Sequence, residues 1–578
     1  MFISNLKIRN FRAIENLELN LNNGLNVIIG ENNSGKSTII DLLHLVFEEG
    51  NYPRKTHWKE TDFRINDGES EPIEFDIRFT IDNQNELAWF NKLHVPIIND
   101  AGDYEHCLEI HGQIKLIKIK SDKKIKRSFW GGKDPENKIP WEVLNALNCI
   151  YLGPLRDINQ DLRPNKTNLL SNLFLNMAEL KGEDYKSNMS EIFKRNFKSE
   201  KWNELIEDGQ EKINYHLNEM NITNTVDNIK IDFSFFEYED IIKKLLLQIP
   251  FNSDLQSNQI YLNLYQNGLG YNNLIYTATL FGDILQRNEI FEQNYNLLLI
   301  EEPESHLHPQ LESTFFRYLD YLNENKDFQL IVTSHSPIIT AKTDLDNLII
   351  LNNLNSSIEA TSIKNIPLSD ENKIFLKKFL DVTKSQLFFA KGVILVEGIT
   401  EALLLPTFAK LIDNKYDLEK RGVEIIVTGT SFSHYAKLFN SDDENQRLKF
   451  RCAILTDDDS HKPKANPNRI KNLDKLKGNN LDLFVGTKTL EYEIYNSNLD
   501  NGIIETVFDK VHERIRKQLD VPFTPDILVE KLESNNTKSD FAFKLANYLD
   551  KEILKNPDYN EFNVPKYIED AIKFVMGD

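Results

Sequence analysis

The chain opens with apolar and polar residues in alternation, which is the pattern of half-buried β-strands. The alternation covers residues 2–8, and a short continuous apolar run follows at Leu25–Ile29. From Ser37 to Glu48 apolar residues recur every three or four positions, which predicts a helix. Residues 71–119 alternate again, and a shift of phase at Ile117 predicts a β-bulge there. The pattern therefore predicts a strand, a loop and a helix in succession, with further strands around them.

Two different patterns follow along the rest of the chain. Residues 168–245 are rich in Glu, Lys, Asn and Leu at helical spacing, which predicts a helical insertion. A surface hairpin without function and an arm for oligomerisation or DNA contact are both compatible with it. Apolar runs at 295–300, 329–333 and 348–351, with helical patterns between them, then predict a parallel sheet. A new apolar strand at Gly392–Val396 starts a further strand–helix series, and the final part of the chain is helical in pattern.

Length and composition limit the classes of protein that remain. A chain of 578 residues exceeds one compact core, so we expect two or three domains. The net charge of −21 disfavours a general nucleic-acid binder, because phosphate contacts dominate DNA affinity, but it permits a local basic surface. No stretch approaches the roughly 20 apolar residues of a membrane span. The first residues also lack the apolar core and cleavage site of a signal peptide.

The three cysteines indicate the cellular compartment in which the protein works. Cys107, Cys149 and Cys452 are far apart and lack the spacing of a metal site. They suit buried free thiols in a reducing environment. We therefore expect a cytoplasmic protein with no membrane contact.

Residues 30–37 fit the phosphate-binding P-loop pattern, in its proper context after an apolar strand and before a helix. Gly30 and Gly35 permit tight turns, so that main-chain N–H groups can surround phosphates, and the helix N-terminus adds its positive dipole end. Lys36 would reach the β- and γ-phosphates, and Ser37 can bind Mg²⁺. The residues expected at the nucleotide are Gly30, Asn32, Asn33, Ser34, Gly35, Lys36, Ser37 and Thr38. The sequence thus predicts binding of ATP or GTP.

A buried strand that ends in two acids follows at 297–304. Glu301 would hold the Mg²⁺ shell, and Glu302 would polarise the attacking water as a general base. A solvated acidic turn is the alternative, but it does not explain the P-loop upstream. His335 follows the next apolar strand, at the sheet edge where ligands of open α/β sheets bind. We interpret His335 as a γ-phosphate sensor.

A second group of acids follows two later strands. Glu397 comes directly after an apolar strand, and Glu401 lies four residues on. Asp457 and Asp459 end another apolar strand and would face the same side in an extended conformation. Carboxylates gathered in one place repel each other unless a cation neutralises them, and oxygen ligands suit Mg²⁺ or Mn²⁺. The alternative is a set of separate, solvated strand ends.

The N-terminal motifs resemble the ABC-type ATPases of the SMC, Rad50 and RecF type. The resemblance places Arg12 near the nucleotide and identifies residues 305–309 with the D-loop. Gly268 and Gly270, in segment 267–274, occupy the place of the signature motif, although they depart from the transporter-type sequence. In that family the signature motif contacts the nucleotide of the opposite subunit. The resemblance therefore implies at least a homodimer.

The C-terminal order of Glu-Gly, a glycine turn at 425–432 and Asp-x-Asp resembles the Toprim domain. Together with the ATPase and the segment 151–157, the chain is similar to the OLD (overcoming lysogenisation defect) family, which includes the nuclease subunit of the Gabija anti-phage system. The implied fold class is α/β, with an N-terminal ABC-type ATPase followed by a C-terminal Toprim domain. We expect the ATPase at 1–380, with a dimerising helical insertion at about 160–255, and the Toprim nuclease with its helical part at 381–578.

The resemblance implies a nuclease that uses Mg²⁺ or Mn²⁺ to cleave double-stranded DNA, controlled by the ATPase and active in anti-phage defence. Two metal ions about 4 Å apart would stabilise the attacking and leaving oxygens. The implied metal ligands are Glu397, Glu401, Asp457, Asp459, and Glu491 or Glu493. Lys538 would neutralise the phosphate in the transition state, so Glu397 and Lys538 join Glu302 as the catalytic candidates. A helicase-type partner protein is also implied.

Two other functions are also compatible with the sequence. An SMC-like DNA-binding ATPase with an inactive Toprim domain would hydrolyse ATP and cut no DNA. A topoisomerase or primase also uses a Toprim domain, but the first needs a tyrosine on a separate DNA-gate domain and the second often adds a zinc module. The sequence leaves open whether ATP activates or inhibits cleavage.

Overall fold

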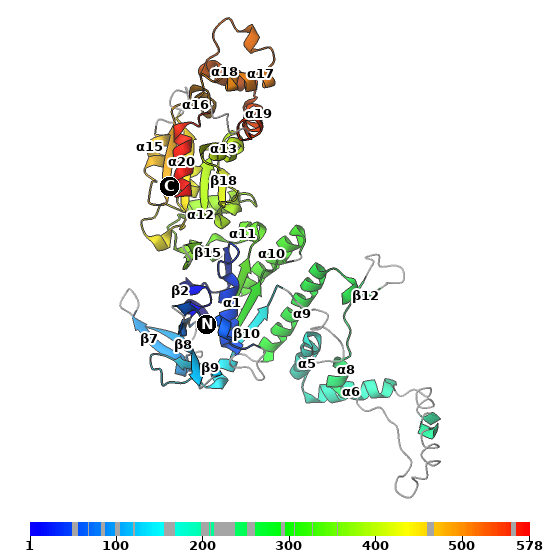
Figure 1. Ribbon diagram of the computed structural model, residues 1–578. Coiled ribbons are helices and arrows are strands. Elements are labelled where there is room, and N and C mark those ends of the chain that lie inside the picture. The colour runs from blue at the N-terminus through cyan, green and yellow to red at the C-terminus, as the bar shows by residue number, and fades with distance from the viewer. Residues whose placement is uncertain are drawn as a thin grey trace.

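The computed structural model describes most of the chain. The described residues are 1–48, 56–66, 69–81, 87–88, 90–98, 104–119, 122–154, 168–197, 207–208, 210–212, 237–250, 261–290, 295–305, 307–325, 328–354, 357–458, 468–555 and 562–577. Figure 1 shows two sheet-containing halves, with the chain entering the second half after α12.

The N-terminal half contains an antiparallel sheet in the order β2-β1-β6-β8-β7, with β9 paired to β8. Its strands are β1 (Phe2–Phe11), β2 (Ile14–Asn20), β6 (Ile73–Thr80), β7 (His94–Ile98), β8 (Tyr104–Ile119) and β9 (Asp122–Gly131). Apolar residues at alternate positions put one face of this sheet into a core shared with α1 (Lys36–Phe47). The other face carries polar side chains.

The predicted β-bulge at Ile117 is wrong. β8 and β9 pair without interruption from Ile110 to Ile119, so the phase shift in the sequence places Ile117, half-buried, on the polar face instead of displacing the backbone. A register shift does occur in this sheet, between Ile3 and Asn5 of β1.

The second sheet of this half is parallel except at one edge, in the order β10-β13-β14-β3-β15-β16. Its strands are β3 (Leu25–Gly30), β10 (Leu147–Leu152), β13 (Tyr295–Glu301), β14 (Gln329–Ser334), β15 (Leu348–Leu354) and the antiparallel β16 (Ser357–Ser362). All residues of β3, β13 and β14 are buried, because α1 and the antiparallel sheet cover one face and three helices cover the other. These helices are α9 (Leu269–Ile290), α10 (Pro309–Asn325) and α11 (Pro337–Lys342).

The helical prediction for the insertion is confirmed where the insertion is described, with one addition. The described elements are α5 (Leu169–Lys181), α6 (Glu183–Phe197), α8 (Tyr238–Ile242), β11 (Gln248–Pro250) and β12 (Tyr261–Asn263). β11 and β12 form an antiparallel pair that the sequence did not predict. α5 packs along α9, where Asn176 donates a 2.6 Å hydrogen bond to Asp283, and α6 points away from both sheets (Figure 1).

The C-terminal half is built on a four-stranded parallel sheet in the order β18-β17-β19-β20. Its strands are β17 (Gly392–Val396), β18 (Val423–Val427), β19 (Arg451–Asp457) and β20 (Leu481–Gly486). The helices around it are α13 (Ile399–Ile412), α14 (Phe432–Ala436), α15 (Arg469–Asp474), α16 (Leu490–Asn496), α17 (Ile503–Val511), α18 (Pro525–Ser534), α19 (Lys538–Tyr548) and α20 (Lys566–Met576). The final part of the chain is therefore helical, as predicted. α13, α19 and α20 share one apolar cluster with the sheet.

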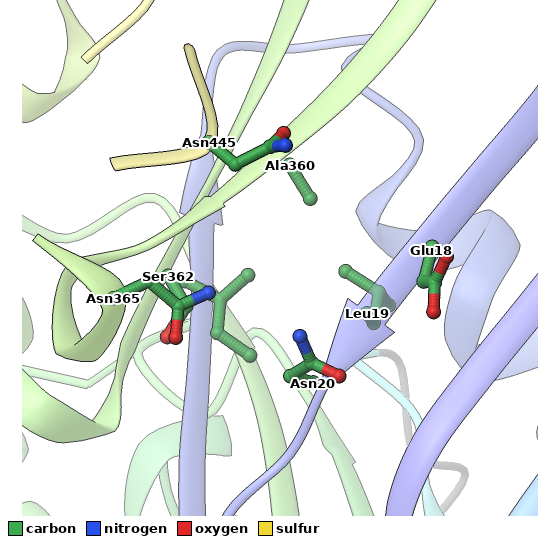
Figure 2. A pocket seen from close by; sticks show the side chains of 8 residues that line it. Glu18, Leu19, Asn20, Ala360, Ser362, Asn365 and Asn445 are labelled. Carbon is green, nitrogen blue, oxygen red and sulfur yellow. The ribbon is translucent and has the colours of Figure 1, made fainter. Parts of the chain in front are cut away.

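The two halves are joined by packed structure. α12 (Asp370–Phe379) and a 3₁₀ segment, η7 (Lys384–Phe389), connect them, and one apolar cluster runs from β3 through Leu387 and Phe388 to β17. Ser385 Oγ donates a 2.9 Å hydrogen bond to the carbonyl oxygen of Pro337 in α11. A cavity of about 250 Å³ also lies at this junction, between Asn20, Ser362 and Asn445 (Figure 2).

Within the described chain, no helix has both the length and the apolar character that a membrane span requires.

Candidate functional site

The predicted phosphate loop, 30–37, connects β3 to α1 at the carboxyl edge of the parallel sheet. Gly30 has φ +153°, and a Cβ atom there would lie 2.3 Å from the carbonyl oxygen of Leu351. Gly35 has φ +92°, and its Cβ would lie 2.8 Å from Ile358 Cδ1. A side chain at either position would collide with β15 or β16, so the loop geometry requires glycine at both.

Lys36 places its ammonium group inside the loop. It donates hydrogen bonds to the carbonyl oxygens of Gly30 (2.9 Å) and Glu31 (2.6 Å) and to Ser34 Oγ (3.3 Å). Burial lowers the pKa of Lys36 to about 8, although nearby carboxylates oppose this. A phosphate would restore the charged form and take over the hydrogen bonds from the carbonyl oxygens.

The remaining loop residues lie at the mouth of the loop. Asn32, Asn33 and Ser37 are exposed, and Thr38 is half-buried. Asn33 has φ +63°, a left-handed conformation that asparagine tolerates better than most residues. Within the described chain the Ser37 hydroxyl has no hydrogen-bond partner, so it is free to bind a cation at the start of α1.

The two acids that end β13 reach the same edge. Glu301 is 6% exposed and accepts a 2.7 Å hydrogen bond from the Tyr151 hydroxyl. Glu302 has φ +43°, which is uncommon for a residue with a side chain, and its Oε1 lies 3.6 Å from His335 Nε2. Burial and the charge of Lys36 lower the pKa of His335, which keeps the imidazole neutral at pH 7. The structure thus brings Lys36, Glu301, Glu302 and His335 together.

Glu304 is a functional candidate that the sequence analysis did not single out. Its Oε1 accepts hydrogen bonds from the His335 amide (2.7 Å) and from Ser334 Oγ (3.0 Å). Burial raises the pKa of Glu304. This carboxyl group holds the end of β14, and therefore His335, in place. A third acid directly after the Glu301–Glu302 pair was the available signal.

Arg12 lies in the turn after β1 with φ +52°. Its guanidinium pairs with Asp62 at 2.9 Å and with Asp41 of α1. These carboxylates raise the pKa of Arg12 against the effect of burial. Arg12 thus links the antiparallel sheet to the helix that carries Lys36 and Ser37.

The segment expected to be the signature motif leads into α9. Gly268 and Gly270 lie at the start of this helix, beside Tyr271, which is 60% exposed. Asn273 Nδ2 donates a 3.5 Å hydrogen bond to the carbonyl oxygen of Ser305, at the start of the predicted D-loop. The two segments are therefore in contact and reach the surface next to each other.

Three of the C-terminal acids gather at the carboxyl edge of the second parallel sheet. Glu397 follows β17, Glu401 lies in the first turn of α13, and Asp457 ends β19. Main-chain groups fix two of them: Gly398 N donates to Glu401 Oε2 (3.2 Å), and Leu490 N donates to Asp457 Oδ2 (3.1 Å). Their placement follows the prediction that strand ends deliver these carboxylates to one edge.

These acids are close enough to disturb each other's ionisation. Burial and three neighbouring carboxylates raise the pKa of Asp457 to about 8. Burial and two of the same neighbours raise the pKa of Glu401 to about 7. The shared neighbours are Glu397 and Glu491. At neutral pH Glu401 and Asp457 therefore retain part of their protons, which limits the repulsion among the carboxyl groups at this edge.

Arg469, in α15, is a site residue that the sequence analysis missed. Its guanidinium donates a hydrogen bond to Glu397 Oε1 and another, 2.7 Å long, to Thr456 Oγ1. Thr456 Oγ1 in turn donates to Glu397. The protein thus compensates one carboxylate of the cluster with its own cation. No motif surrounds Arg469, and only the fold of the chain brings it to β17.

Glu491 and Glu493, the two alternatives for a further acid, have different surroundings. Glu491 is 3% exposed, and Lys538 Nζ lies 3.3 Å from its Oε2. Lys538 also pairs with Glu533 at 3.0 Å. Glu493 Oε1 accepts a 2.9 Å hydrogen bond from the Thr487 amide and so closes the turn before α16. The structure therefore brings Glu491 and Lys538 to the cluster and gives Glu493 a local bonding role.

The donor set fits a hard divalent cation, although the side chains do not yet surround one. Within the described chain, no three His, Cys, Asp or Glu side chains are grouped closely enough to hold a metal ion. Asp459 lies outside the described residues. Glu397, Glu401 and Asp457 would hold the cation once Arg469 released Glu397, because oxygen ligands with raised pKa values gain most from added positive charge.

One ion pair connects the nucleotide loop to the C-terminal half. Lys391 Nζ lies 3.2 Å from Glu31 Oε2. Glu31 belongs to the phosphate loop, and its carbonyl oxygen is bonded to Lys36. Lys391 directly precedes β17, the strand that ends at Glu397. The ion pair between Glu31 and Lys391, followed by strand β17, therefore forms a short connection between the two candidate sites.

Two family profiles match the chain. The AAA ATPase domain matches residues 1–141 and 155–340, which is more than half of the chain. The TOPRIM domain of overcoming lysogenization defect protein-like proteins matches residues 388–459. The first match contains the nucleotide site, and the second contains Glu397, Glu401 and Asp457.

Curated relatives are similar over much of the chain. Endonuclease GajA of Bacillus cereus (strain HuB5-5) is 26% identical in an alignment of 416 positions that covers 58% of this chain and 59% of that protein. Endonuclease GajA of Bacillus cereus (strain VD045) is 24% identical over 79% of this chain and 75% of that protein. The OLD nuclease of Thermus scotoductus (strain ATCC 700910 / SA-01) is 22% identical over 74% and 79%. The match thus spans less than two thirds of the first of these relatives.

Solved structures give weaker likenesses. An SMC head bound to the C-terminal winged-helix domain of ScpA is 15% identical, with a TM-score of 0.35, over 65% of this chain and 100% of that chain. The C-terminal region of the Xanthomonas campestris pv. campestris OLD protein is 24% identical, with a TM-score of 0.24, over 33% and 95%.

The predicted fold class and the predicted resemblance are both confirmed by these profiles and relatives. The parallel sheet with its phosphate loop lies in the region of the first profile, and the four-stranded sheet with its acids lies in the region of the second. The chain belongs to the AAA ATPase domain family in its N-terminal part and carries an OLD-like TOPRIM domain in its C-terminal part.

Proposed function

We propose that this protein is a metal-dependent DNA endonuclease whose cleavage is controlled by ATP. The observation that carries the proposal is the group of Glu397, Glu401 and Asp457 at one sheet edge, with pKa values of about 7 and about 8 for Glu401 and Asp457. Buried acids held where they repel each other are typical of a site that binds cations. The relatives named endonuclease and nuclease support DNA as the substrate class.

The residues of the cluster have distinct roles in this proposal. Glu397, Glu401 and Asp457 hold the divalent cations, with Asp459 and Glu491 as further ligands of the set. Bound Mg²⁺ or Mn²⁺ would activate the attacking water and stabilise the leaving oxygen of the phosphodiester. Lys538, held beside the cluster by Glu491, supplies a positive charge to the phosphate in the transition state.

The N-terminal site binds and hydrolyses ATP in the same proposal. Lys36 and the main-chain N–H groups of the loop hold the phosphates, while Ser37 and Glu301 hold Mg²⁺. Glu302 polarises the attacking water, and neutral His335 donates a hydrogen bond to the γ-phosphate. Gly268 and Gly270 would contact the nucleotide of a second subunit, which makes the active form at least a homodimer.

We propose that ATP controls cleavage through the ion pair between Glu31 and Lys391. A phosphate that attracts Lys36 removes the hydrogen bond from the Glu31 carbonyl group. Glu31 is paired with Lys391, and β17 carries any displacement of Lys391 towards Glu397. Coupling between the two sites requires that the phosphate loop and β17 have one arrangement with ATP and another without it.

The biological setting extends the proposal. We place the ATPase at 1–380, including a dimerising insertion at about 160–255, and the nuclease at 381–578. The resemblance to the Gabija nuclease subunit supports a role in anti-phage defence, in the cytoplasm, with a helicase-type partner protein.

A plasmid-cleavage assay with Mg²⁺ or Mn²⁺ tests the proposal. We expect the wild-type protein to nick or linearise the plasmid and Glu397→Ala to lose at least about a thousandfold of the cleavage rate. Glu419→Ala, a change of the same kind at an exposed glutamate of the same domain, should cleave at the wild-type rate. If the protein hydrolyses ATP but cleaves no DNA with either metal ion, it is instead an SMC-like ATPase with an inactive Toprim domain.

A further inference from the structure

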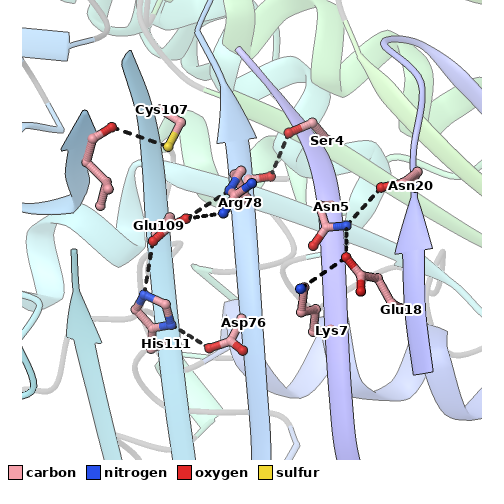
Figure 3. A network of polar contacts seen from close by, with 11 residues as sticks. Ser4, Asn5, Lys7, Glu18, Asn20, Asp76, Arg78, Cys107, Glu109 and His111 are labelled. Carbon is pink, nitrogen blue, oxygen red and sulfur yellow. Dashed lines mark hydrogen bonds and ion pairs between the residues drawn. The ribbon is translucent and has the colours of Figure 1, made fainter. Parts of the chain in front are cut away.

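The outer face of the antiparallel sheet carries paired charges over most of its width (Figure 3). Lys7 pairs with Glu18 at 3.1 Å, and Arg78 pairs with Glu109 at 2.8 Å. His111 lies 3.4 Å from Glu109 and also contacts Asp76. Burial opposes protonation of this histidine, yet its carboxylate partners raise the pKa of His111 to about 9. Each cation on this part of the face is therefore matched by an acid.

The ribbon formed by β8 and β9 has a different composition. Residues 112–133 contain eight lysine or arginine residues and one acid, in a chain of net charge −21. The register places Lys115 opposite Lys126 and Ile117 opposite Lys124. Because paired and alternate residues of a ribbon share a face, Lys115, Lys124 and Lys126 lie on the face that carries His111. We call these three exposed lysines the lysine ribbon.

The lysine ribbon lacks the compensation seen on the rest of the sheet. In the described parts of the chain, no acidic side chain is within ion-pair distance of Lys115, Lys124 or Lys126. Like charges directly opposite each other on neighbouring strands lower the stability of a hairpin. Lys123, on the other face of β9, does have a partner, Glu60 at 2.9 Å. The exposed face thus holds a concentration of positive charge that the protein itself does not neutralise.

We propose that the lysine ribbon binds the phosphate backbone of double-stranded DNA. This inference rests on the proposed function, which makes DNA the substrate. Lys124 and Lys126 are two strand residues apart, about 6.8 Å, which matches the rise of about two nucleotides along the duplex axis, so both lysines can contact phosphates of one DNA strand. Ser128, exposed on the same face, can donate a hydrogen bond to a phosphate oxygen, whereas Gln113 opposite it already donates to Glu74.

The position of the lysine ribbon in the fold limits its role to binding DNA. Figure 1 shows β9 at the end of the N-terminal half that is remote from the C-terminal sheet. A duplex on the ribbon is therefore held away from Glu397 and its neighbours. Lysine contacts to phosphates carry no sequence information, so the ribbon strengthens binding to every duplex equally. It contributes to substrate affinity and leaves the chemical step unchanged.

Equilibrium binding of the full-length protein to a fluorescent mixed-sequence duplex tests the inference. The measurements are made in EDTA, so that no cleavage occurs, and at several salt concentrations between roughly 50 and 200 mM. In the triple variant Lys115→Gln, Lys124→Gln, Lys126→Gln we expect roughly tenfold weaker binding and a salt slope smaller by about 3, near 0.9 for each lost phosphate contact. The triple arginine variant should bind as the wild type does.

A matched control separates a local surface from net charge. Lys377→Gln, Lys420→Gln, Lys477→Gln removes the same charge from lysines that are paired with acids elsewhere. This control should keep the wild-type affinity and salt slope. Equal losses in both triple variants, or wild-type binding by the ribbon variant, would overturn the inference. So would a loss of binding to anionic phospholipid vesicles with DNA binding unchanged.

Cleavage assays keep this inference separate from the proposed function. If the wild type cuts DNA and the ribbon variant binds normally, the ribbon is refuted and the nuclease stands. If the ribbon variant loses DNA affinity while the wild type cleaves no DNA with either metal ion, the DNA-binding role of the lysine ribbon is supported and the proposed nuclease function is refuted. We expect the ribbon variant to melt at or above the wild-type temperature, because opposed like charges are removed, and such a result shows that weaker binding does not come from misfolding.

Discussion

The nucleotide loop and the carboxylate cluster both lie at the carboxyl edge of a parallel sheet, but they reach different degrees of completion without a ligand. In the loop, the Lys36 ammonium group donates hydrogen bonds to three oxygen atoms of other loop residues, two from the main chain and one from a side chain. In the cluster, Glu401 and Asp457 keep raised pKa values although Arg469 pairs with Glu397 and Lys538 pairs with Glu491. An anion site made of main-chain groups can form alone, whereas a cation site made of carboxylates needs the cation to relieve repulsion.

Removal of Lys36 should produce the largest effect that separates the two sites. We expect Lys36→Ala to weaken ATP binding by on the order of a hundredfold, because the buried charge that faces the phosphates is lost. Lys378→Ala, at an exposed lysine of α12, is the matched control and should bind ATP normally. Equilibrium binding of a fluorescent ATP analogue gives the affinities. Retained ATP affinity in Lys36→Ala would contradict the proposed loop function.

The raised pKa values predict how stability depends on pH without metal. Glu401 and Asp457 hold protons in the folded state up to about pH 7 and pH 8, but release them near pH 4 when unfolded. The folded state therefore binds more protons between these limits, and stability falls as pH rises from about 4 to 8. We expect the melting temperature to drop by roughly 5 °C between pH 6 and pH 8 in EDTA.

Two comparisons check this prediction. Mg²⁺ should recover most of the lost melting temperature at pH 8 and little at pH 6, because a metal ion replaces the protons. Asp457→Asn should flatten the pH dependence. A melting temperature that rises with pH over this range in EDTA would show that these acids do not repel each other in the folded protein.

Arg469 and a metal ion compete for the same carboxylate of Glu397. In Arg469→Ala we expect about tenfold tighter Mg²⁺ binding and a lower melting temperature in EDTA, since the protein cation no longer compensates Glu397. Arg469→Lys should lie between this variant and the wild type. Isothermal titration with Mg²⁺ provides the affinities. Weaker Mg²⁺ binding in Arg469→Ala would mean that the guanidinium supports the metal site.

The smallest expected effect concerns the ion pair between the two halves. Lys391 is 61% exposed and Glu31 is 36% exposed, so the pair contributes little to stability. We expect Lys391→Ala to change the response of cleavage to ATP by a factor of about 5 or less, with ATP affinity and ATP-free cleavage unaltered. Lys384→Ala removes a lysine that is paired within its own segment and should keep the wild-type ATP response. An ATP response in Lys391→Ala identical to that of the wild type would exclude this route.

Much of this architecture follows from local sequence patterns. The loop at 30–37 and the acids Glu301, Glu302 and Glu397 are contiguous with apolar strands, so the strand and its terminal residue are predicted together. Glu304 was missed because its role depends on the position of Ser334 and His335, which come from the neighbouring strand.

Other features depend on pairing between distant segments, which one sequence does not show. Arg469 reaches Glu397 across 72 positions of the chain, and no local pattern marks it. The phase shift at Ile117 predicted a bulge, but the partner strand β9 fixed a regular register and left Ile117 on the polar face. The lysine ribbon likewise becomes visible only when Lys115 and Lys126 are known to be opposite each other. The role of the helical insertion stays a prediction.

A plasmid-cleavage assay shows whether ATP controls a nuclease in this protein. The wild type, Lys36→Ala and Glu397→Ala are each assayed with Mg²⁺ or Mn²⁺, and with no nucleotide, ATP or a non-hydrolysable analogue. We predict that Glu397→Ala cuts under no condition but still turns over ATP, and that Lys36→Ala cuts at a rate that neither nucleotide changes. Cleavage by Glu397→Ala at the wild-type rate, or an intact ATP response in Lys36→Ala, would contradict this proposal.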